Sequence, residues 1–216
     1  FHRSAWIAEL QAETQGVPVV FQNSYRDPSL FAFYTGNQAF TFTDANYRKN
    51  QYDIWNWEKV LHNQRVVIAG QPSWDCTNCK PLELTRKNLM LKIVDSLQIS
   101  QKVHFEFEAP KMLSPGDTVG LDVAIHNPYE HTILLDAGNM PLRMVVIFYR
   151  DERVNGKSAL QFEQPLTELS ANETTTVKAS FEVPAGLQGE YVFALGIQTG
   201  DLPSSFNSRL SKVIIN

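Results

Sequence analysis

The hydrophobic pattern of this chain changes once, near Met90, and that change limits the folds open to it. Before Met90, short apolar runs alternate with segments of helical spacing, whereas after it strand-like segments recur between turns. Two patterns of this kind predict two parts with different architectures. We therefore expect an α+β two-part chain, with a small α/β domain over residues 1–92 and an immunoglobulin-like antiparallel β-sandwich over residues 93–216.

The first part is expected to alternate helices with short buried strands. Helices are predicted over 3–14, 28–36 and 52–62, and strands over 17–21, 39–43 and 65–70. The apolar side of the third helix would consist of Ile54, Trp55, Val60 and Leu61. Continuously apolar strands between helices are typical of a parallel sheet with right-handed crossovers. The expected unit is a three-layer one with a short parallel sheet.

The second part reads as about seven strands separated by turn signals, a spacing typical of β-sandwiches. Apolar and polar residues alternate over 119–126 and 174–183, and Asn155-Gly156 predicts a tight turn. The segment has no cysteine, so the sandwich lacks the antibody-type disulfide. The boundary between the parts is expected within 87–101.

Composition limits the classes of partner. The formal net charge is −4 and no basic run is present, which argues against a nucleic-acid partner. The longest apolar stretches, such as 144–149, are far shorter than the roughly twenty residues of a membrane-spanning helix. The chain begins at Phe1, without Met or a signal-peptide pattern, and we expect it to have been cut or matured from a longer protein.

Cys76 and Cys79 lie in the motif Trp-Asp-Cys-Thr-Asn-Cys. A short disulfide that pins a loop is the favoured interpretation, as in exported proteins. Free thiols, a redox-active pair and a metal site remain alternatives. A metal site would need further ligands, since there is no second Cys pair.

A first candidate site follows the first predicted strand and consists of Tyr25, Arg26 and Asp27. Open α/β sheets bind ligands at the carboxyl ends of their strands, and an arginine there can hold a carboxylate or phosphate. The alternative is that Asp27 only caps the next helix, while Arg26 pairs with a neighbouring acid.

A second candidate site follows the second predicted strand, so it is expected beside the first. It consists of Tyr47, Arg48 and Lys49, followed by Trp55 and Trp57. Aromatic and basic residues together suit a sugar, a lipid phosphate or a membrane surface. The alternative is a solvated loop, with Trp55 in the core and Trp57 half-exposed.

Familiar catalytic motifs do not occur in the sequence. There is no Gly-x-Ser-x-Gly elbow, no phosphate-binding loop and no dinucleotide fingerprint. The five histidines are scattered without metal-ligand spacing. We therefore assign no catalytic residue, no cofactor and no metal.

The segments Val17–Gly36 and Tyr47–Trp55 resemble the soluble C-terminal region of polytopic membrane glycosyltransferases. These are enzymes of the protein mannosyltransferase and 4-amino-4-deoxy-L-arabinose transferase type, which use a lipid-phosphate-linked sugar donor. The resemblance extends to about Cys79. In that family the membrane-embedded half carries the catalytic carboxylate, so no catalytic residue is carried over to this chain.

The resemblance implies a place and a role. The chain would lie on the extracytoplasmic (periplasmic) face of the cytoplasmic membrane, against the membrane-embedded half of its parent, and would recognise a glycan, lipid-linked sugar or protein acceptor or cover the active site. The main alternative is a free-standing exported module that binds glycan or protein. A thiol–disulfide enzyme using Cys76 and Cys79 is a third hypothesis.

Overall fold

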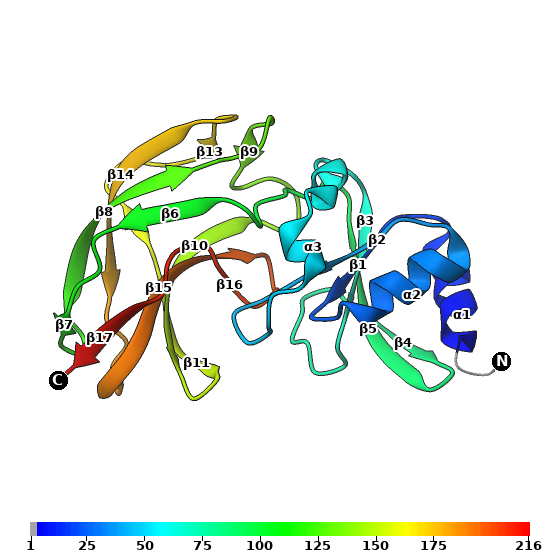
Figure 1. Ribbon diagram of the computed structural model, residues 1–216, viewed down its shortest axis with the longest axis horizontal. Coiled ribbons are helices and arrows are strands. Elements are labelled where there is room, and N and C mark those ends of the chain that lie inside the picture. Colours follow the sequence, from blue (N-terminus) through cyan, green and yellow to red (C-terminus); the bar gives the residue numbers. More distant parts are fainter. Residues whose placement is uncertain (1–3) are drawn as a thin grey trace. The chain divides into compact units, whose positions relative to one another are not determined.

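Two units make up the chain, which the computed structural model describes over residues 4–216 (Figure 1). Unit 1 comprises the residues up to Ile99 together with Ala137–Met140, and unit 2 comprises Ser100–Asp136 and Pro141–Asn216. The division at Ile99 falls within the segment 87–101 but after the expected end of the first domain at residue 92. The reason is that residues 87–94 form a strand of unit 1 and not a connection.

Unit 1 is built on a five-stranded mixed sheet with strand order β2-β1-β3-β5-β4. Its elements are α1 (Ala5–Thr14), β1 (Val19–Gln22), α2 (Arg26–Thr35), β2 (Ala39–Phe42), α3 (Gln51–Ile54), the 3₁₀ helix η1 (Trp57–Leu61), β3 (Val66–Gly70), β4 (Lys80–Leu84) and β5 (Lys87–Val94). Strands β2, β1 and β3 are parallel, as their continuously apolar sequences predict. The β4–β5 hairpin is antiparallel and was not expected, so the prediction of a parallel sheet holds for only three of the strands.

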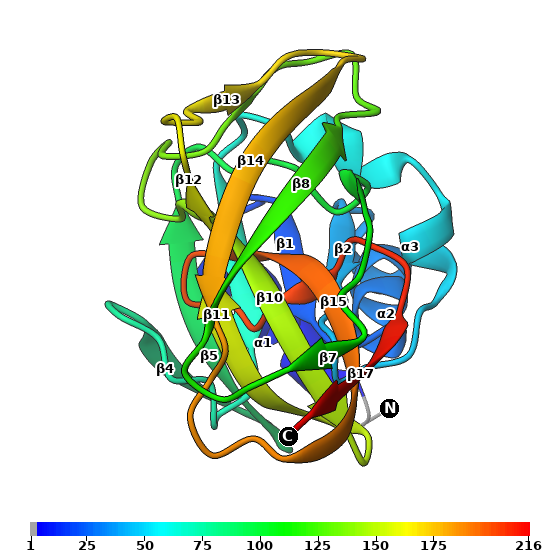
Figure 2. The same cartoon turned by 90° about the vertical axis from the view of Figure 1, so that its left-hand side faces the viewer.

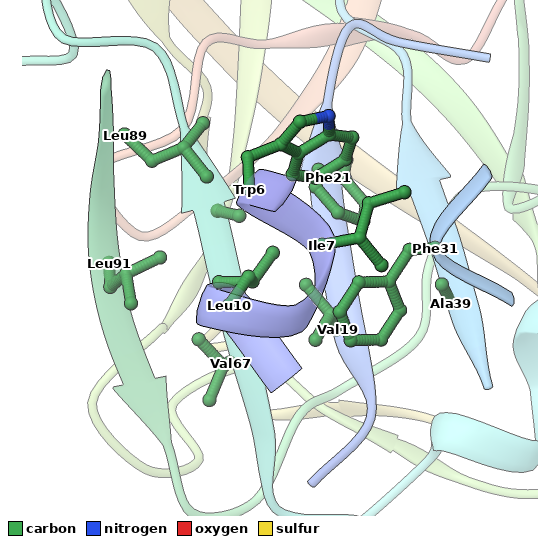
Figure 3. Packing of buried hydrophobic residues seen from close by; sticks show 11 residues of the cluster. Trp6, Ile7, Leu10, Val19, Phe21, Phe31, Ala39, Val67, Leu89 and Leu91 are labelled. Atoms are coloured by element: carbon green, nitrogen blue, oxygen red, sulfur yellow. The ribbon is translucent and has the colours of Figure 1, made fainter. Parts of the chain in front are cut away.

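One cluster of buried side chains in unit 1 lies on one face of this sheet (Figure 3). Helix α1 contributes Trp6, Ile7 and Leu10, which pack with Phe31 of α2. The sheet side of the cluster consists of Val19, Phe21, Ala39, Val67, Ala69, Leu89 and Leu91. Strand residues two apart share a face, so β1 presents Val19 and Phe21 to the helices. Both ten-residue helices therefore cover the same face of the sheet. The three-layer arrangement, which needs a helix on each face, is not formed by these two helices.

The helix predicted over 52–62 is wrong. An Asn50–Asp53 capping box begins α3, but the chain turns extended at Trp55 and resumes as η1. Residues two apart lie on opposite sides of an α-helix, so the observed stacking of Trp55 on Trp57 requires this break. Of the expected apolar side, only Leu61 is buried, whereas Ile54 is 74% exposed.

Unit 2 is an immunoglobulin-like β-sandwich. Its strands are β6 (His104–Phe107), β7 (Met112–Leu113), β8 (Thr118–His126), β9 (Ile133–Leu134), β10 (Leu142–Arg150), β11 (Arg153–Ala159), β12 (Gln161–Phe162), β13 (Glu168–Leu169), β14 (Thr174–Glu182), β15 (Gly189–Thr199), β16 (Ser205–Phe206) and β17 (Ser211–Ile215). The larger sheet has the order β11-β10-β15-β17-β7 with β16 on β15, the second has the order β12-β14-β8-β6, and β13 pairs with β9. Figure 2 shows β8 beside β14, which pair along their full lengths.

The sandwich core joins residues from both sheets. Phe181 of β14 contacts Phe148 of β10 and Phe193 of β15, with ring centroids 6.3 and 5.6 Å apart, and all three rings are buried. The alternation expected for β8 is present, since Leu121, Val123 and Ile125 are buried while their neighbours are more exposed. Burying one face of each sheet against the other is what defines this architecture.

The turn predicted at Asn155-Gly156 is wrong, because both residues lie inside β11. The β10–β11 hairpin instead turns at Asp151 and Glu152, whose φ angles are 55° and 60°. Two successive positive φ values are typical of the tight turns that join antiparallel strands, and aspartate, as at Asp151, tolerates them better than most residues. Within residues 4–216, no helix is long and apolar enough to cross a membrane.

Candidate binding surface

The two predicted polar clusters emerge at one edge of the unit 1 sheet. Strands β1 and β2 are parallel neighbours, so the loops that follow them leave from the same edge. Asn23 and Asp44 tie these loops together: the side-chain amide nitrogen of Asn23 donates to the Asp44 carboxylate at 2.6 Å, and the Asp44 backbone N–H donates to the side-chain Oδ1 of Asn23 at 3.0 Å. Ser24 adds a hydrogen bond to the Thr41 hydroxyl, at 3.1 Å. The positions of both loops are thus fixed by paired polar groups.

The side chains of the two clusters meet. The Arg48 guanidinium carbon lies 5.7 Å from the centre of the Tyr25 ring, within the range of a cation–π contact. One turn along α2, the Ser29 hydroxyl lies 3.2 Å from the Tyr52 hydroxyl. Arg26 and Lys49 are exposed nearby in sequence, and Tyr47 is half-buried.

Aromatic residues extend this surface over α3 and η1. The Tyr52 ring lies 6.2 Å from that of Trp55 and 6.5 Å from that of Trp57. The two tryptophan rings stack at 4.3 Å with an angle of 30° between their planes. Trp55 is 42% exposed and Trp57 is 55% exposed, so placing Trp55 in the core is wrong. The Trp55 ring packs on Trp57, which is itself exposed.

Sequence reasoning missed several members of this surface. Phe33 and Tyr34 of α2 are exposed and contact each other edge to face, with centroids 5.2 Å apart. Phe33 lies four residues beyond Ser29 and eight beyond Tyr25, a spacing that places all three on one side of a helix. That spacing was available in the sequence. We call the exposed side chains of this region the α2–α3 surface; they are Tyr25, Arg26, Phe33, Tyr34, Arg48, Lys49, Ile54, Trp55 and Trp57, with the half-buried Tyr52 among them.

Acidic groups in the same stretch are held by other residues. Asp27 does not cap α2; the Ser24 hydroxyl accepts a hydrogen bond from the Asp27 backbone N–H at 3.1 Å. The Asp27 carboxylate instead lies 2.6 Å from the Lys87 ammonium. Asp53 closes the capping box of α3, and the side chain of Glu58 is buried. The surface therefore presents its basic groups to solvent, while the nearby acids are paired, capping a helix or buried.

The disulfide between Cys76 and Cys79 is present, with Cα atoms 5.9 Å apart, and neither cysteine is free. It closes the loop that joins β3 to β4. Trp74 in this loop is buried, and a Cβ atom added to Gly70 would collide with its ring. The residue after Cys79 begins a strand and not a helix, so the pair lacks the helix N-terminus that lowers thiol pKa values in many redox enzymes.

Two further features could mark a site beyond this surface, namely candidate metal ligands and carboxyl groups with a shifted pKa. Among residues 4–216, no group of three or more His, Cys, Asp or Glu side chains is placed to hold a metal ion. Glu9 is the acid with the clearest perturbation: the Thr85 hydroxyl and backbone N–H donate to its carboxylate at 2.6 and 2.7 Å, which lowers the pKa of Glu9. This contact joins α1 to the β4–β5 turn, and its role is structural.

Comparison with known proteins identifies no family. No family model matches the chain, and no curated protein matches it. Among solved structures, the CARDB domain of the PF1109 protein from Pyrococcus furiosus has a TM-score of 0.30 and 12% identity, covering 53% of this chain and 94% of that one. The sporulation control protein Spo0M of Bacillus subtilis (TM-score 0.30, 11% identity, 53% and 49%) and the Pseudomonas fluorescens alkylpurine DNA glycosylase AlkC (0.33, 6%, 53% and 30%) are similar to the same extent. Similarities this low assign no function, so any function must be argued from the surface itself.

Proposed function

We propose that this chain is the extracytoplasmic accessory part of a polytopic membrane glycosyltransferase that uses a lipid-phosphate-linked sugar donor. In this proposal unit 1 is the small α/β domain of that family, unit 2 is an appended sandwich, and the chemistry takes place in a membrane-embedded half of the parent. The chain would recognise the acceptor or cover the active site at the periplasmic face of the cytoplasmic membrane.

One observation carries the proposal. The segments that resemble the family, residues 17–36 and 47–55, are the segments that build the α2–α3 surface, although they are separated in sequence. Their contact through Tyr25 and Arg48 makes them a single feature of the folded chain. Aromatic faces bind sugar rings and guanidinium groups bind phosphates or carboxylates, which matches the chemistry of a lipid-phosphate-linked sugar and its acceptor.

The test is sugar transfer by the full-length parent carrying Arg26→Ala or Arg48→Ala. Both side chains are exposed, so the variants should fold normally, and each should lower transfer about tenfold, the effect of losing one charged contact of about 1.4 kcal/mol. Arg65→Ala is the matched control, since Arg65 is an exposed arginine of the same unit that pairs with Asp95. Normal transfer by both the Arg26 and Arg48 variants would refute the site.

A second candidate is a free-standing exported module that binds glycan. The exposed, stacked Trp55 and Trp57 favour it, because aromatic faces are a common platform for sugar rings. The two candidates differ in the native protein: the first predicts a membrane-embedded parent, and the second predicts a secreted chain that binds its glycan without any other part.

A further inference from the structure

We propose that the α2–α3 surface seats unit 1 directly on an anionic lipid bilayer, with its aromatic side chains in the headgroup region. This deepens the proposed function, because it names what the surface contacts at the membrane. The exposed aromatic side chains of this surface are concentrated in one stretch of the chain and lie beside exposed bases.

Exposed apolar side chains are concentrated in one stretch of the chain. Among the described residues, twelve large hydrophobic side chains are exposed, and seven of them lie between Tyr25 and Val60. Phe33 is 81% exposed, the highest of the twelve. Single exposed apolar residues are ordinary, but a contiguous group marks an interaction site.

Contacts make the group continuous within unit 1. Along α2, Tyr25, Ser29 and Phe33 follow one another at helical spacing. Ser29 contacts Tyr52, which in turn contacts the stacked tryptophans. The contact between Ser29 and Tyr52 places α3 beside α2. The aromatic side chains therefore form one surface and not scattered points.

Charge selects the partner. The chain as a whole has a formal net charge of −4, yet the bases of residues 25–60 are all exposed, namely Arg26, Arg48, Lys49 and Lys59. The acids of the same stretch are half-buried or buried, namely Asp27, Asp44, Asp53 and Glu58. An outward display of cations beside tryptophan and tyrosine complements the phosphates of an anionic bilayer, and interfacial residues of membrane proteins show the same combination.

Ile54 of this surface, and Val60 of η1 close to it in sequence, add aliphatic side chains that favour a lipid contact. Ile54 and Val60 are exposed and bear no group that hydrogen-bonds to a hydroxyl. A sugar site orients hydroxyls with fixed polar groups around an aromatic face. A bilayer interface, in contrast, accepts isoleucine, phenylalanine and tryptophan side chains without any polar partner.

The experiment uses the 216-residue chain and vesicles of phosphatidylcholine with 30% phosphatidylglycerol. Binding is measured by co-sedimentation and by tryptophan emission. Because Trp6 and Trp74 are buried, a blue shift on binding reports Trp55 and Trp57, and quenching by brominated lipid chains reports their depth. We expect the chain to bind these vesicles, to bind pure phosphatidylcholine at least tenfold more weakly, and to dissociate as salt is raised.

Variants locate the binding surface. Arg48→Ala with Lys49→Ala should weaken partitioning about 25-fold, from about fivefold per charge near an anionic surface. Trp55→Phe with Trp57→Phe should remove the blue shift while the circular dichroism spectrum stays unchanged. The matched control is Lys178→Ala with Leu210→Ala, an exposed lysine and an exposed leucine of unit 2, which should bind as the wild type does.

Three results would overturn the inference. They are no binding to anionic vesicles, equal loss in the unit 2 control, and an emission shift caused by soluble oligosaccharide but not by vesicles. The last result would assign the surface to glycan. Failure here is distinct from failure of the proposed function, since vesicle binding is measured on the chain without its parent and sugar transfer is measured on the parent.

Discussion

At the scale of single residues, Lys87 joins three elements of unit 1. Its ammonium group lies 2.6 Å from the Asp27 carboxylate of α2 and 4.6 Å from the centre of the Trp6 ring of α1, while Lys87 itself begins β5. The side chains of the pair are only 20% and 23% exposed, so water screens this ion pair less than one on the open surface. The pair holds the start of α2, and hence Tyr25 and Arg26, against the sheet.

Asp27→Asn should therefore lower the free energy of unfolding of unit 1 by about 1 kcal/mol, because it leaves a half-buried ammonium without its counter-charge. Asp95→Asn makes the same chemical change in the exposed pair with Arg65 and should cost less than about 0.5 kcal/mol. Urea unfolding followed by tryptophan emission measures both, since all four tryptophans of the chain lie in unit 1. Equal effects of the two variants would mean that the Asp27 pair does not stabilise α2.

At the scale of elements, the loop from β3 to β4 is shaped by its disulfide and by Trp74. Cys76 and Cys79 are three residues apart, so their bond closes a very short loop. Gly70, the last residue of β3, has no Cβ and leaves room for the Trp74 ring to lie over the end of the strand. The loop thereby covers an apolar side chain at the carboxyl edge of the sheet.

Replacing both cysteines by serine should lower the stability of unit 1 by about 2 kcal/mol, the value that the chain-entropy model gives for so short a loop. The same tryptophan-monitored urea titration measures this change. Dithiothreitol should shift the wild-type curve by a similar amount and leave the double variant unchanged. A wild-type curve that reductant does not move would contradict a stabilising role for this bond.

Strands were predictable from the sequence to a greater extent than helices and turns. Runs such as Val19–Gln22 and Val66–Gly70 are short, mostly apolar and rich in valine and isoleucine, a combination typical of a buried strand. The β4–β5 hairpin was missed because residues 80–84 lie at an edge and carry exposed charges, which hides the alternation. The helix over 52–62 failed because spacing alone does not reveal that Trp55 packs on Trp57.

The candidate surface was predictable only in part. Parallel strands place their following loops at one edge, so the meeting of Tyr25 with Arg48 followed from the order of elements. The sequence pattern does not predict which side chains of residues 54–60 are exposed, because this depends on where the helix breaks. The sequence pattern therefore located the region but assigned its most apolar residues to the core.

At the scale of the whole molecule, the two units carry different features. Unit 1 carries the aromatic and basic side chains of the α2–α3 surface, and unit 2 is a sandwich with its own aromatic core. We propose, as the central claim, that this chain works as the water-exposed part of a larger membrane protein.

Fractionation of the source cells tests this claim most directly. An antibody raised against the 216-residue chain should detect a protein much larger than its 24.5 kDa, retained in the membrane pellet after carbonate washing and cut by protease added to the outer face. A soluble species of about the mass of the chain itself, released without detergent, would contradict the account.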